Sequence, residues 1–303
     1  MHGAVVRTPL LPCPWADTSE RSLWLKPENL QPTGAFKLRG AHNAISRLDE
    51  RARRAGVVAY SSGNHAQAVA YAARTFGVSA HIVMPEVTPA VKVEATRRHG
   101  AEVRLVPIEQ RESAALELVE ERGAVLVPPF DHPDVIAGQG TVGVEITEDL
   151  PGIDVVLVPV SGGGLASGIG TAIKALCPDA AVIGVEPALA ADTRDSLRAG
   201  HLVRWPVAER ARTIADGLRA EPSELTFAHL TAVLDDLVVV TEDEIMSAVR
   251  TLAGESRLVA EPSGATATAA YLYHADELPH GRTVSVVSGG NVDRSTLVEI
   301  LGT

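Results

Sequence analysis

Residues 56–85 read GVVAYSSGNHAQAVAYAARTFGVSAHIVMP, and this stretch decides the fold class. Gly56–Tyr60 is a short apolar run typical of a buried strand, and Asn64–Phe76 has a helical pattern that ends at Gly77. Ala80–Met84 is a second apolar run of the same kind. A strand, a helix and a strand in this order predict a right-handed unit of a parallel sheet.

The alternation continues in both directions along the chain. Helices are expected over Val91–His99 and Arg111–Arg122, each closed by a glycine, with strands over Glu102–Val106 and Val125–Val127. Further strands are expected at Asp154–Val160, Ala181–Val185, Val238–Val240 and Val284–Val287, interrupted by an irregular stretch from about Glu186 to Thr241. We therefore expect an α/β protein with two parallel or mostly parallel sheets and flanking helices.

Composition limits the classes of function. The chain has 303 residues, is 46% hydrophobic and carries a formal net charge of -11. The acidic balance argues against a nucleic-acid partner and favours a protein that handles small molecules. The sequence contains no run of about 18 apolar residues, so we expect no membrane helix. Met1–Pro9 lacks the basic and apolar regions of a signal peptide. Cys13 and Cys177 have no metal-ligand context, so we expect two buried free thiols and a cytoplasmic location.

Lys37 is the first candidate for chemistry. It follows a turn and opens the helical pattern Lys37–Leu48, beside Ala35, Phe36 and Leu38. An ammonium near a helix N-terminus in apolar surroundings loses its proton more readily, and a neutral amine is what imine chemistry needs. Taken alone, the segment fits an ordinary surface lysine at a helix start better.

Three further segments follow strands directly. Ser61–Gln67 opens a helix, and its hydroxyl and amide groups could bind a carboxylate or simply cap the helix. Ser161–Gly168 has three successive glycines that suit a phosphate monoester, without the lysine of a nucleotide P-loop. Ser288–Asn291 offers a serine to a heterocyclic ring nitrogen, or is a plain strand-end turn.

Together and in this order, the four segments resemble the fold-type II pyridoxal-phosphate family, in its serine racemase and serine/threonine dehydratase branch. The resemblance spans about Leu10–Asp293 and includes the phrases at 136–141 and 213–217. It implies a tryptophan synthase β-like fold with the cofactor in a cleft between two domains. The large cofactor-binding domain is then formed by residues 1–51 and 136–303, and the small α/β domain by residues 52–135.

The resemblance also implies roles for cofactor contacts. Lys37, with Phe36 beside it, matches the lysine that holds pyridoxal 5′-phosphate as an imine and later removes the Cα proton. Asn64 matches the partner of the ring hydroxyl, and Ser288 matches the partner of the ring nitrogen. The phosphate cradle corresponds to Ser161, Gly162, Gly163, Gly164 and Leu165, and the less specific matches at the cofactor's border are Gly217 and Glu261.

Substrate contacts are implied for Ser61, Ser62, Asn64, His65 and Arg111. Ser62 matches the acid/base of the racemases on the face opposite the lysine, although it could equally bind the substrate carboxylate. Arg111 matches an arginine at the racemase substrate pocket, or is a surface residue at a helix start. The racemase serine that contacts the substrate carboxylate is replaced here by Ala220, so the resemblance does not carry the family's substrate pose or its preference for serine over to this chain.

A divalent-ion site is implied at Glu186, Ala190 and Asp192. Two carboxylates and one backbone carbonyl are hard oxygen ligands that suit Mg²⁺ or Ca²⁺. The alternative is a solvated acidic loop.

Three functions remain open at this point. The first is a lyase that converts L-serine, L-threonine or a related 3-hydroxy-amino acid to a 2-oxo acid and ammonia. The second is a serine or aspartate racemase with side β-elimination, and the third is a non-catalytic α/β binding protein with a phosphate site. The resemblance further implies a homodimer, and the short tail after Ser288 leaves no room for a regulatory domain.

Overall fold

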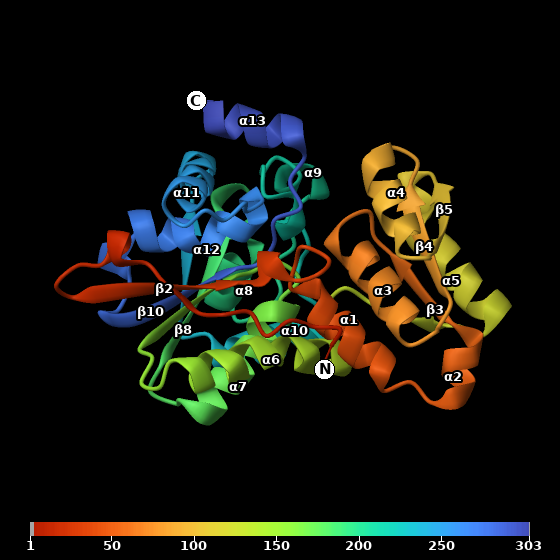
Figure 1. The fold of residues 1–303 in the computed structure, drawn as a ribbon, viewed down its shortest axis with the longest axis horizontal. Coiled ribbons are helices and arrows are strands. Elements are labelled where there is room, and N and C mark those ends of the chain that lie inside the picture. Colours follow the sequence, from red (N-terminus) through yellow and green to blue (C-terminus); the bar gives the residue numbers. More distant parts are fainter. Residues whose placement is uncertain (1–2, 303) are drawn as a thin grey trace. The chain divides into compact units, whose positions relative to one another are not determined.

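The computed structural model describes residues 3–302, which form two compact units (Figure 1). Unit 1 comprises the residues up to Val6 together with Gln31–Gly138, and unit 2 comprises Arg7–Leu30 together with the chain from Gln139 onward. The predicted domain boundaries differ from these units in where they place the residues up to Val6, residues 31–51 and residues 136–138, and they stay a prediction.

Unit 1 is built on a four-stranded parallel sheet in the order β5-β4-β3-β6. The predicted alternation of strands and helices is confirmed. The strands are β3 (Val57–Tyr60), β4 (Ala80–Pro85), β5 (Glu102–Val106) and β6 (Val125–Leu126), and the helices are α1 (Lys37–Ser46), α2 (Glu50–Ala55), α3 (Asn64–Thr75), α4 (Ala90–Arg98) and α5 (Arg111–Arg122).

Successive residues of β3 pack on opposite faces of this sheet. Val57 and Ala59 are buried in one apolar cluster with residues of α1 and α3, whereas Val58 lies in another cluster with α5, against which Tyr60 packs. Because both faces are covered at the centre of the sheet, β3 and β4 are nearly continuous apolar runs, which is why the sequence reveals them so clearly. The loops at the strands' carboxyl ends then lie outside the packed layers.

Unit 2 contains a six-stranded sheet in the order β1-β2-β10-β7-β8-β9, parallel except for the antiparallel pair β1 and β2. The expected fold class is thus confirmed. β2 was not predicted from the sequence, because its polar residues Arg21, Ser22 and Lys26 interrupt the apolar pattern. The strand nevertheless pairs with β10 along its whole length. The strands are β1 (Leu11–Pro12), β2 (Arg21–Pro27), β7 (Val155–Pro159), β8 (Ala181–Pro187), β9 (Asp236–Val240) and β10 (Gly281–Val287).

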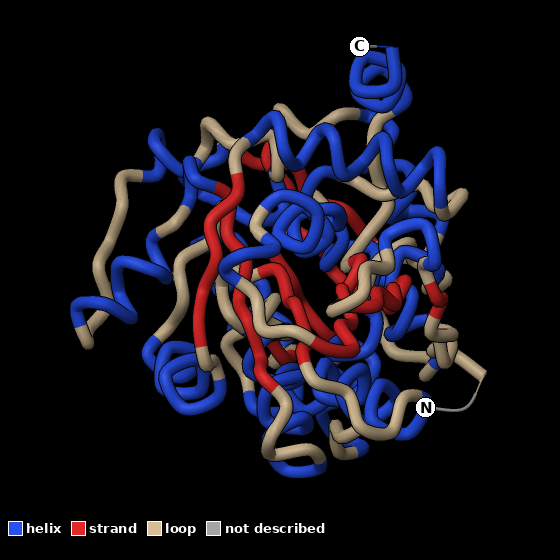
Figure 2. The backbone as a smooth tube through the Cα atoms, turned by 90° about the vertical axis from the view of Figure 1, so that its left-hand side faces the viewer, coloured by secondary structure: helices blue, strands red, loops and turns tan. Residues whose placement is uncertain are grey.

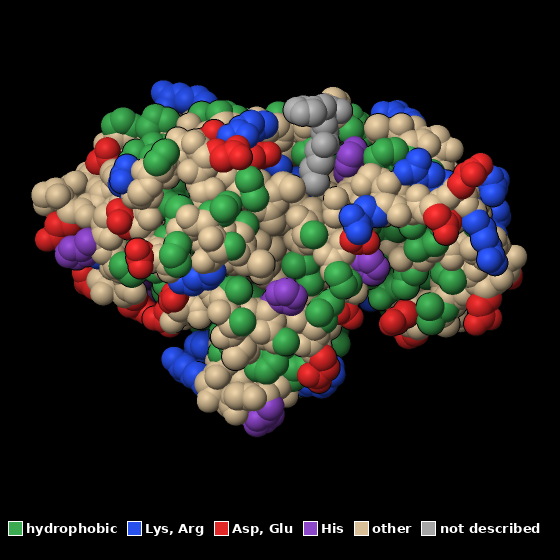
Figure 3. Space-filling view, turned by 90° about the horizontal axis from the view of Figure 1, so that it is seen from below, with side chains coloured by type: hydrophobic (Ala, Val, Ile, Leu, Met, Phe, Trp, Pro, Cys, Tyr) green, Lys and Arg blue, Asp and Glu red, His purple; other side chains and the backbone are tan. Residues whose placement is uncertain are grey.

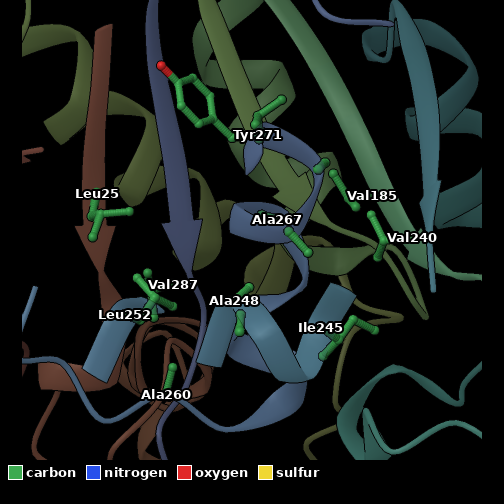
Figure 4. Close-up of a cluster of buried hydrophobic side chains, with 14 of the residues drawn as sticks. Leu25, Val185, Val240, Ile245, Ala248, Leu252, Ala260, Ala267, Tyr271 and Val287 are labelled. Atoms are coloured by element: carbon green, nitrogen blue, oxygen red, sulfur yellow. The ribbon is translucent and has the colours of Figure 1, made fainter. Parts of the chain in front are cut away.

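Helices cover this sheet on both faces, as the tube view also indicates (Figure 2). One face packs on α11 and α12 through a cluster that includes Leu25, Val185 and Val240 (Figure 4). The other face packs on α7, where Gly170 approaches Val182. The helices of unit 2 are α7 (Gly164–Leu176), α8 (Asp192–Ala199), α9 (Val207–Arg210), α10 (Glu224–Val233), α11 (Glu242–Glu255), α12 (Pro262–Tyr273) and α13 (Arg294–Gly302), and α6 (Pro133–Asp149) contains the boundary between the units.

The stretch that was expected to be irregular, 186–241, holds three short helices, α8 to α10. Within residues 3–302, no helix is both long and apolar enough to cross a bilayer. Cys13 is buried and Cys177 is half-buried, and both thiols are free. Acidic and basic side chains are interspersed on the face that Figure 3 shows.

Candidate active site

Lys37 is the first residue of α1 and lies in a desolvated position. Its Nζ donates a hydrogen bond to the Pro129 carbonyl at 2.7 Å and lies 5.0 Å from the centre of the Phe36 ring. The side chain is half-buried, and the protein atoms packed around the amine desolvate it. This burial lowers the pKa of Lys37 to about 8. A large share of the amine is therefore neutral near pH 8, as nucleophilic and base chemistry requires.

The loop between β3 and α3 carries the predicted serine and asparagine residues. The Ser61 hydroxyl accepts a hydrogen bond from the Gly63 amide at 3.3 Å, and α3 begins at Asn64. Within the described part of the chain, the Ser62 hydroxyl has no hydrogen-bond partner. The first amides of a helix point out of its N-terminus, so this loop can receive a carboxylate while Ser62 stays available for proton transfer.

His65 is buried in the second position of α3 and does not present its ring as a surface ligand. Its Nε2 lies 2.8 Å from the Val127 carbonyl, and burial, aided by the charge of Lys37, lowers the pKa of His65 to about 3. The imidazole is therefore neutral at all ordinary pH values. Its predicted contact with the substrate stays a prediction.

Arg111 begins α5 and reaches the same end of β3. Its guanidinium carbon lies 5.7 Å from the centre of the Tyr60 ring, directly before Ser61 in the chain, and its Nε is buried without a hydrogen-bond partner among the described residues. Unit 1 thus brings Lys37 and His65 together, and places Arg111 beside the strand that leads into the serine loop.

The glycine loop of unit 2 follows β7 and leads into α7, which begins at Gly164. Gly163 has φ +87°, and a Cβ added there would lie 2.9 Å from the Cβ of Thr226. Both observations require glycine at this position. The glycines thus let the chain turn tightly into the N-terminus of α7, and backbone amides at a helix N-terminus are the groups that bind a phosphate.

Ser161, at the start of this loop, is fixed by Ala220. Its hydroxyl donates to the Ala220 carbonyl at 3.0 Å and accepts from the Ala220 amide at 2.9 Å. The glycine loop and the segment around residue 220 are therefore tied together inside unit 2.

Ser263 connects the remaining cofactor candidates Gly217 and Ser288, and it is not among the residues that the sequence predicted. Its hydroxyl accepts from the Gly217 amide at 2.9 Å, and its carbonyl accepts from the Ser288 hydroxyl at 3.4 Å. Glu261 lies at the N-terminus of α12, and its amide donates to the Gly289 carbonyl at 3.1 Å. Nothing in the local sequence distinguishes Ser263 from an ordinary helix serine, because its role depends on contacts with two distant loops.

The predicted ion ligands lie after β8. Glu186 is buried and accepts hydrogen bonds from the Thr193 and Arg194 amides at 3.1 and 2.9 Å, and burial raises the pKa of Glu186 to about 8. Asp192 has a buried Oδ2 without a partner among the described residues, and burial raises the pKa of Asp192 to about 6. Residues 3–302 contain no group of three His, Cys, Asp or Glu side chains arranged around a metal.

The serine loop, the glycine loop, the acidic pair and Ser288 each lie at or just after the carboxyl end of a strand, as expected of an α/β fold. Unit 1 contains Lys37, the loop after β3 and Arg111. Unit 2 contains the glycine loop after β7, the acidic pair after β8 and Ser288 after β10.

Comparison with known proteins gives a consistent result. Residues 2–289 match the family described as pyridoxal-phosphate dependent enzyme. The chain is 46% identical over 283 residues to the L-threonine ammonia-lyase of Thermotoga maritima, covering 92% of this chain and 69% of the relative. It is 42% identical over 274 residues to the L-threo-3-hydroxyaspartate ammonia-lyase of Saccharomyces cerevisiae, covering 89% and 83%.

A solved structure of maize serine racemase superposes with a TM-score of 0.92 at 40% identity, covering 97% of this chain and 91% of that one. All three comparisons indicate the same family: the family match covers nearly the whole chain, the ammonia-lyase is 46% identical, and the solved structure agrees in fold. The chain belongs to the pyridoxal-phosphate dependent enzymes.

Proposed function

We propose that this protein is a pyridoxal-phosphate dependent ammonia-lyase that converts L-threonine, L-serine or a related 3-hydroxy-amino acid to a 2-oxo acid and ammonia. The observation that carries the proposal is the Lys37 amine, buried at a helix start with its pKa lowered to about 8. The ammonia-lyases among the relatives support this reaction class.

The residues present fit the cofactor. A desolvated amine suits its aldehyde, and the turn at Gly163 leads into a helix N-terminus whose backbone amides suit its phosphate. Ser288 is buried and offers a hydroxyl to the ring nitrogen. When bound, pyridoxal phosphate supplies an aldehyde that joins an amine and a ring that withdraws electrons from Cα of the amino acid.

Each of the protein's own site residues then has a separate role in the proposed reaction. Lys37, once its amine is neutral, accepts the Cα proton. The amides at the start of α3 hold the substrate carboxylate, and Asn64 stands beside them to orient the cofactor ring. Ser288 is a hydroxyl and not a carboxylate, so it leaves less positive charge at the ring nitrogen, which favours loss of the β-hydroxyl over transfer of the amino group.

The proposal is tested with a panel of L- and D-serine, L-threonine and 3-hydroxyaspartate, assayed together for 2-oxo acid, ammonia and enantiomer. We expect equal amounts of oxo acid and ammonia from at least one L-hydroxy-amino acid. Lys37→Ala should lose both turnover and the visible absorption of the bound cofactor. Retention of both by Lys37→Ala would rule the proposal out.

A racemase is the second candidate, and Ser62 favours it. Its hydroxyl has no hydrogen-bond partner in the described part of the chain and is therefore free to exchange a proton at Cα. The similarity to maize serine racemase supports the same possibility. Formation of D-serine from L-serine in the panel above decides between a lyase alone and a lyase with racemase activity.

We further propose a Mg²⁺ or Ca²⁺ site at Glu186, the Ala190 carbonyl and Asp192. The unpartnered Asp192 Oδ2 beside the buried Glu186 supports it, because buried carboxylate oxygens are normally satisfied by a donor or a cation. A chelator should lower activity or the melting temperature, and re-addition of Mg²⁺ should restore it. No response to either would contradict the site.

We also propose a homodimer in the cytoplasm. The free thiols Cys13 and Cys177 support a reducing compartment, and the family resemblance supports the dimer. Sedimentation equilibrium of the purified protein measures the oligomeric state directly.

A further inference from the structure

Two carbonyls of one short segment, residues 127–129, receive hydrogen bonds from two functional residues of unit 1. The Val127 carbonyl lies 2.8 Å from Nε2 of His65, and the Pro129 carbonyl accepts from Nζ of Lys37 at 2.7 Å. His65 and Lys37 come from different helices, α3 and α1. The segment therefore links the histidine to the lysine.

The tautomer of His65 follows from this contact. A carbonyl oxygen can only accept, so Nε2 must carry the proton and Nδ1 must be the bare nitrogen. Nδ1 is buried and has no hydrogen-bond partner among the described residues. The ring is therefore used as a donor to Val127 alone, and its low pKa keeps it from placing a second positive charge beside Lys37.

The segment between the two carbonyls has little freedom. The Val127 amide donates to the Val58 carbonyl at 2.9 Å, so Val127 is held at both of its backbone polar groups. Pro128 and Pro129 follow, and the ring of each proline fixes φ. Once the Val127 carbonyl is held, the Pro129 carbonyl has few other places to lie.

We propose that His65 is a positioning residue for Lys37: its Nε2–H holds the Val127 carbonyl and thereby fixes the Pro129 carbonyl that receives the lysine amine. The inference rests on the proposed function, in which Lys37 bonds the cofactor and accepts the Cα proton. Between these tasks the amine has to stay in a defined, water-poor position, and the Pro129 carbonyl provides it. Loss of the histidine bond would let the segment move and water reach the amine.

The proposal is tested by replacing His65 with two amide side chains of different length. In His65→Gln the amide nitrogen takes the place of Nε2 and can still donate to Val127, whereas the shorter amide of His65→Asn corresponds to Nδ1 and cannot. His81→Asn is the matched control, because His81 is also buried in unit 1 but pairs with Glu102. All three are compared with the wild type after the cofactor has been removed.

The readout is the pH dependence of acetic anhydride labelling at Lys37, followed by peptide mass spectrometry. The assay is simple because the chain has only four lysines, Lys26, Lys37, Lys92 and Lys174. We expect midpoints near pH 8 for the wild type, His65→Gln and His81→Asn. His65→Asn should have a midpoint at least about one pH unit higher, which makes labelling about tenfold slower on the acid side. An unchanged midpoint in His65→Asn, or an equal shift in His65→Gln, would overturn the proposal.

A second measurement needs no variant. Nitrogen-15 NMR of the histidine rings should show His65 as the Nε2–H tautomer, unchanged between pH 5 and pH 8, and the opposite tautomer would refute the role. Neither readout depends on turnover. Failure of the proposed function would instead appear as cofactor absorption retained in Lys37→Ala, whatever His65 does.

Discussion

Removing the Lys37 amine should change how the stability of the cofactor-free protein depends on pH. Burial lowers the pKa of Lys37 from its ordinary value of 10.5 to about 8. Between these two values the unfolded chain binds the proton and the folded chain does not, so folding stability rises with pH in this window. Each pKa unit corresponds to about 1.4 kcal/mol, which gives a rise of about 3 kcal/mol that ends near pH 10.5.

Lys37→Met has no titratable amine and should lack this rise. Urea unfolding followed by far-ultraviolet circular dichroism, measured from pH 7 to 10.5, gives the two free energies of unfolding. Their difference, variant minus wild type, should fall by about 3 kcal/mol across the window. The hydrogen bond to Pro129 changes the size of the difference at any one pH, but the pH-dependent fall reports desolvation. Lys92→Met controls for the loss of a lysine as such, and a difference that stays flat with pH would refute the desolvated amine.

Three other predictions follow from the two units. Ser62→Ala should abolish any formation of D-serine while changing elimination from L-threonine by less than about tenfold, because Lys37 removes the Cα proton in elimination and the loss of a group that transfers a proton costs about 100-fold or more; persistence of D-serine would exclude the acid/base role. Gly163→Ala should destabilise the protein by about 1–3 kcal/mol and weaken cofactor binding, because φ is +87° there and the added Cβ would meet Thr226. Thermal unfolding and cofactor titration measure the two effects. Gly254→Ala is the control, because an added Cβ at Gly254 meets no atom within 4 Å. With no cation present, the raised pKa values of Glu186 and Asp192 mean that the folded state binds protons that the unfolded chain has lost, so the free energy of unfolding should fall as pH rises from about 4.5 to 8. Mg²⁺ should reduce that fall in the wild type but not in Asp192→Asn. Equal melting curves with and without Mg²⁺ would count against the site.

The regular part of the fold could be predicted because its strands are covered on both faces. The limits expected for α5 agree with the structure residue for residue, since Gly123 marks its end, and the apolar runs expected at β3 and β4 agree with those strands to within one residue. β2 could not be predicted in the same way. Its Lys26 is fully buried, and the amine bonds the Thr8 carbonyl and Glu145, so a charged residue occupies a core position through distant partners.

The site residues that could be predicted differ from those that could not in whether local sequence marks them. Lys37, the serine loop and the glycine loop were found because each directly follows a strand or opens a helix in the sequence. Ser263 and the Pro129 carbonyl were not found, because one acts through two distant loops and the other is a backbone atom. The buried ring of His65 could not be told from a surface ligand either, since burial is a property of the packed chain.

The central claim is that Lys37 bonds the cofactor, and borohydride reduction tests it most directly. Reduction of the purified holoprotein makes the lysine–cofactor link permanent, and peptide mass spectrometry then locates it among the four lysines. The pyridoxyl group should be found on Lys37 in nearly every molecule. A group on Lys26, Lys92 or Lys174, or no group in protein that retains turnover, would contradict the claim.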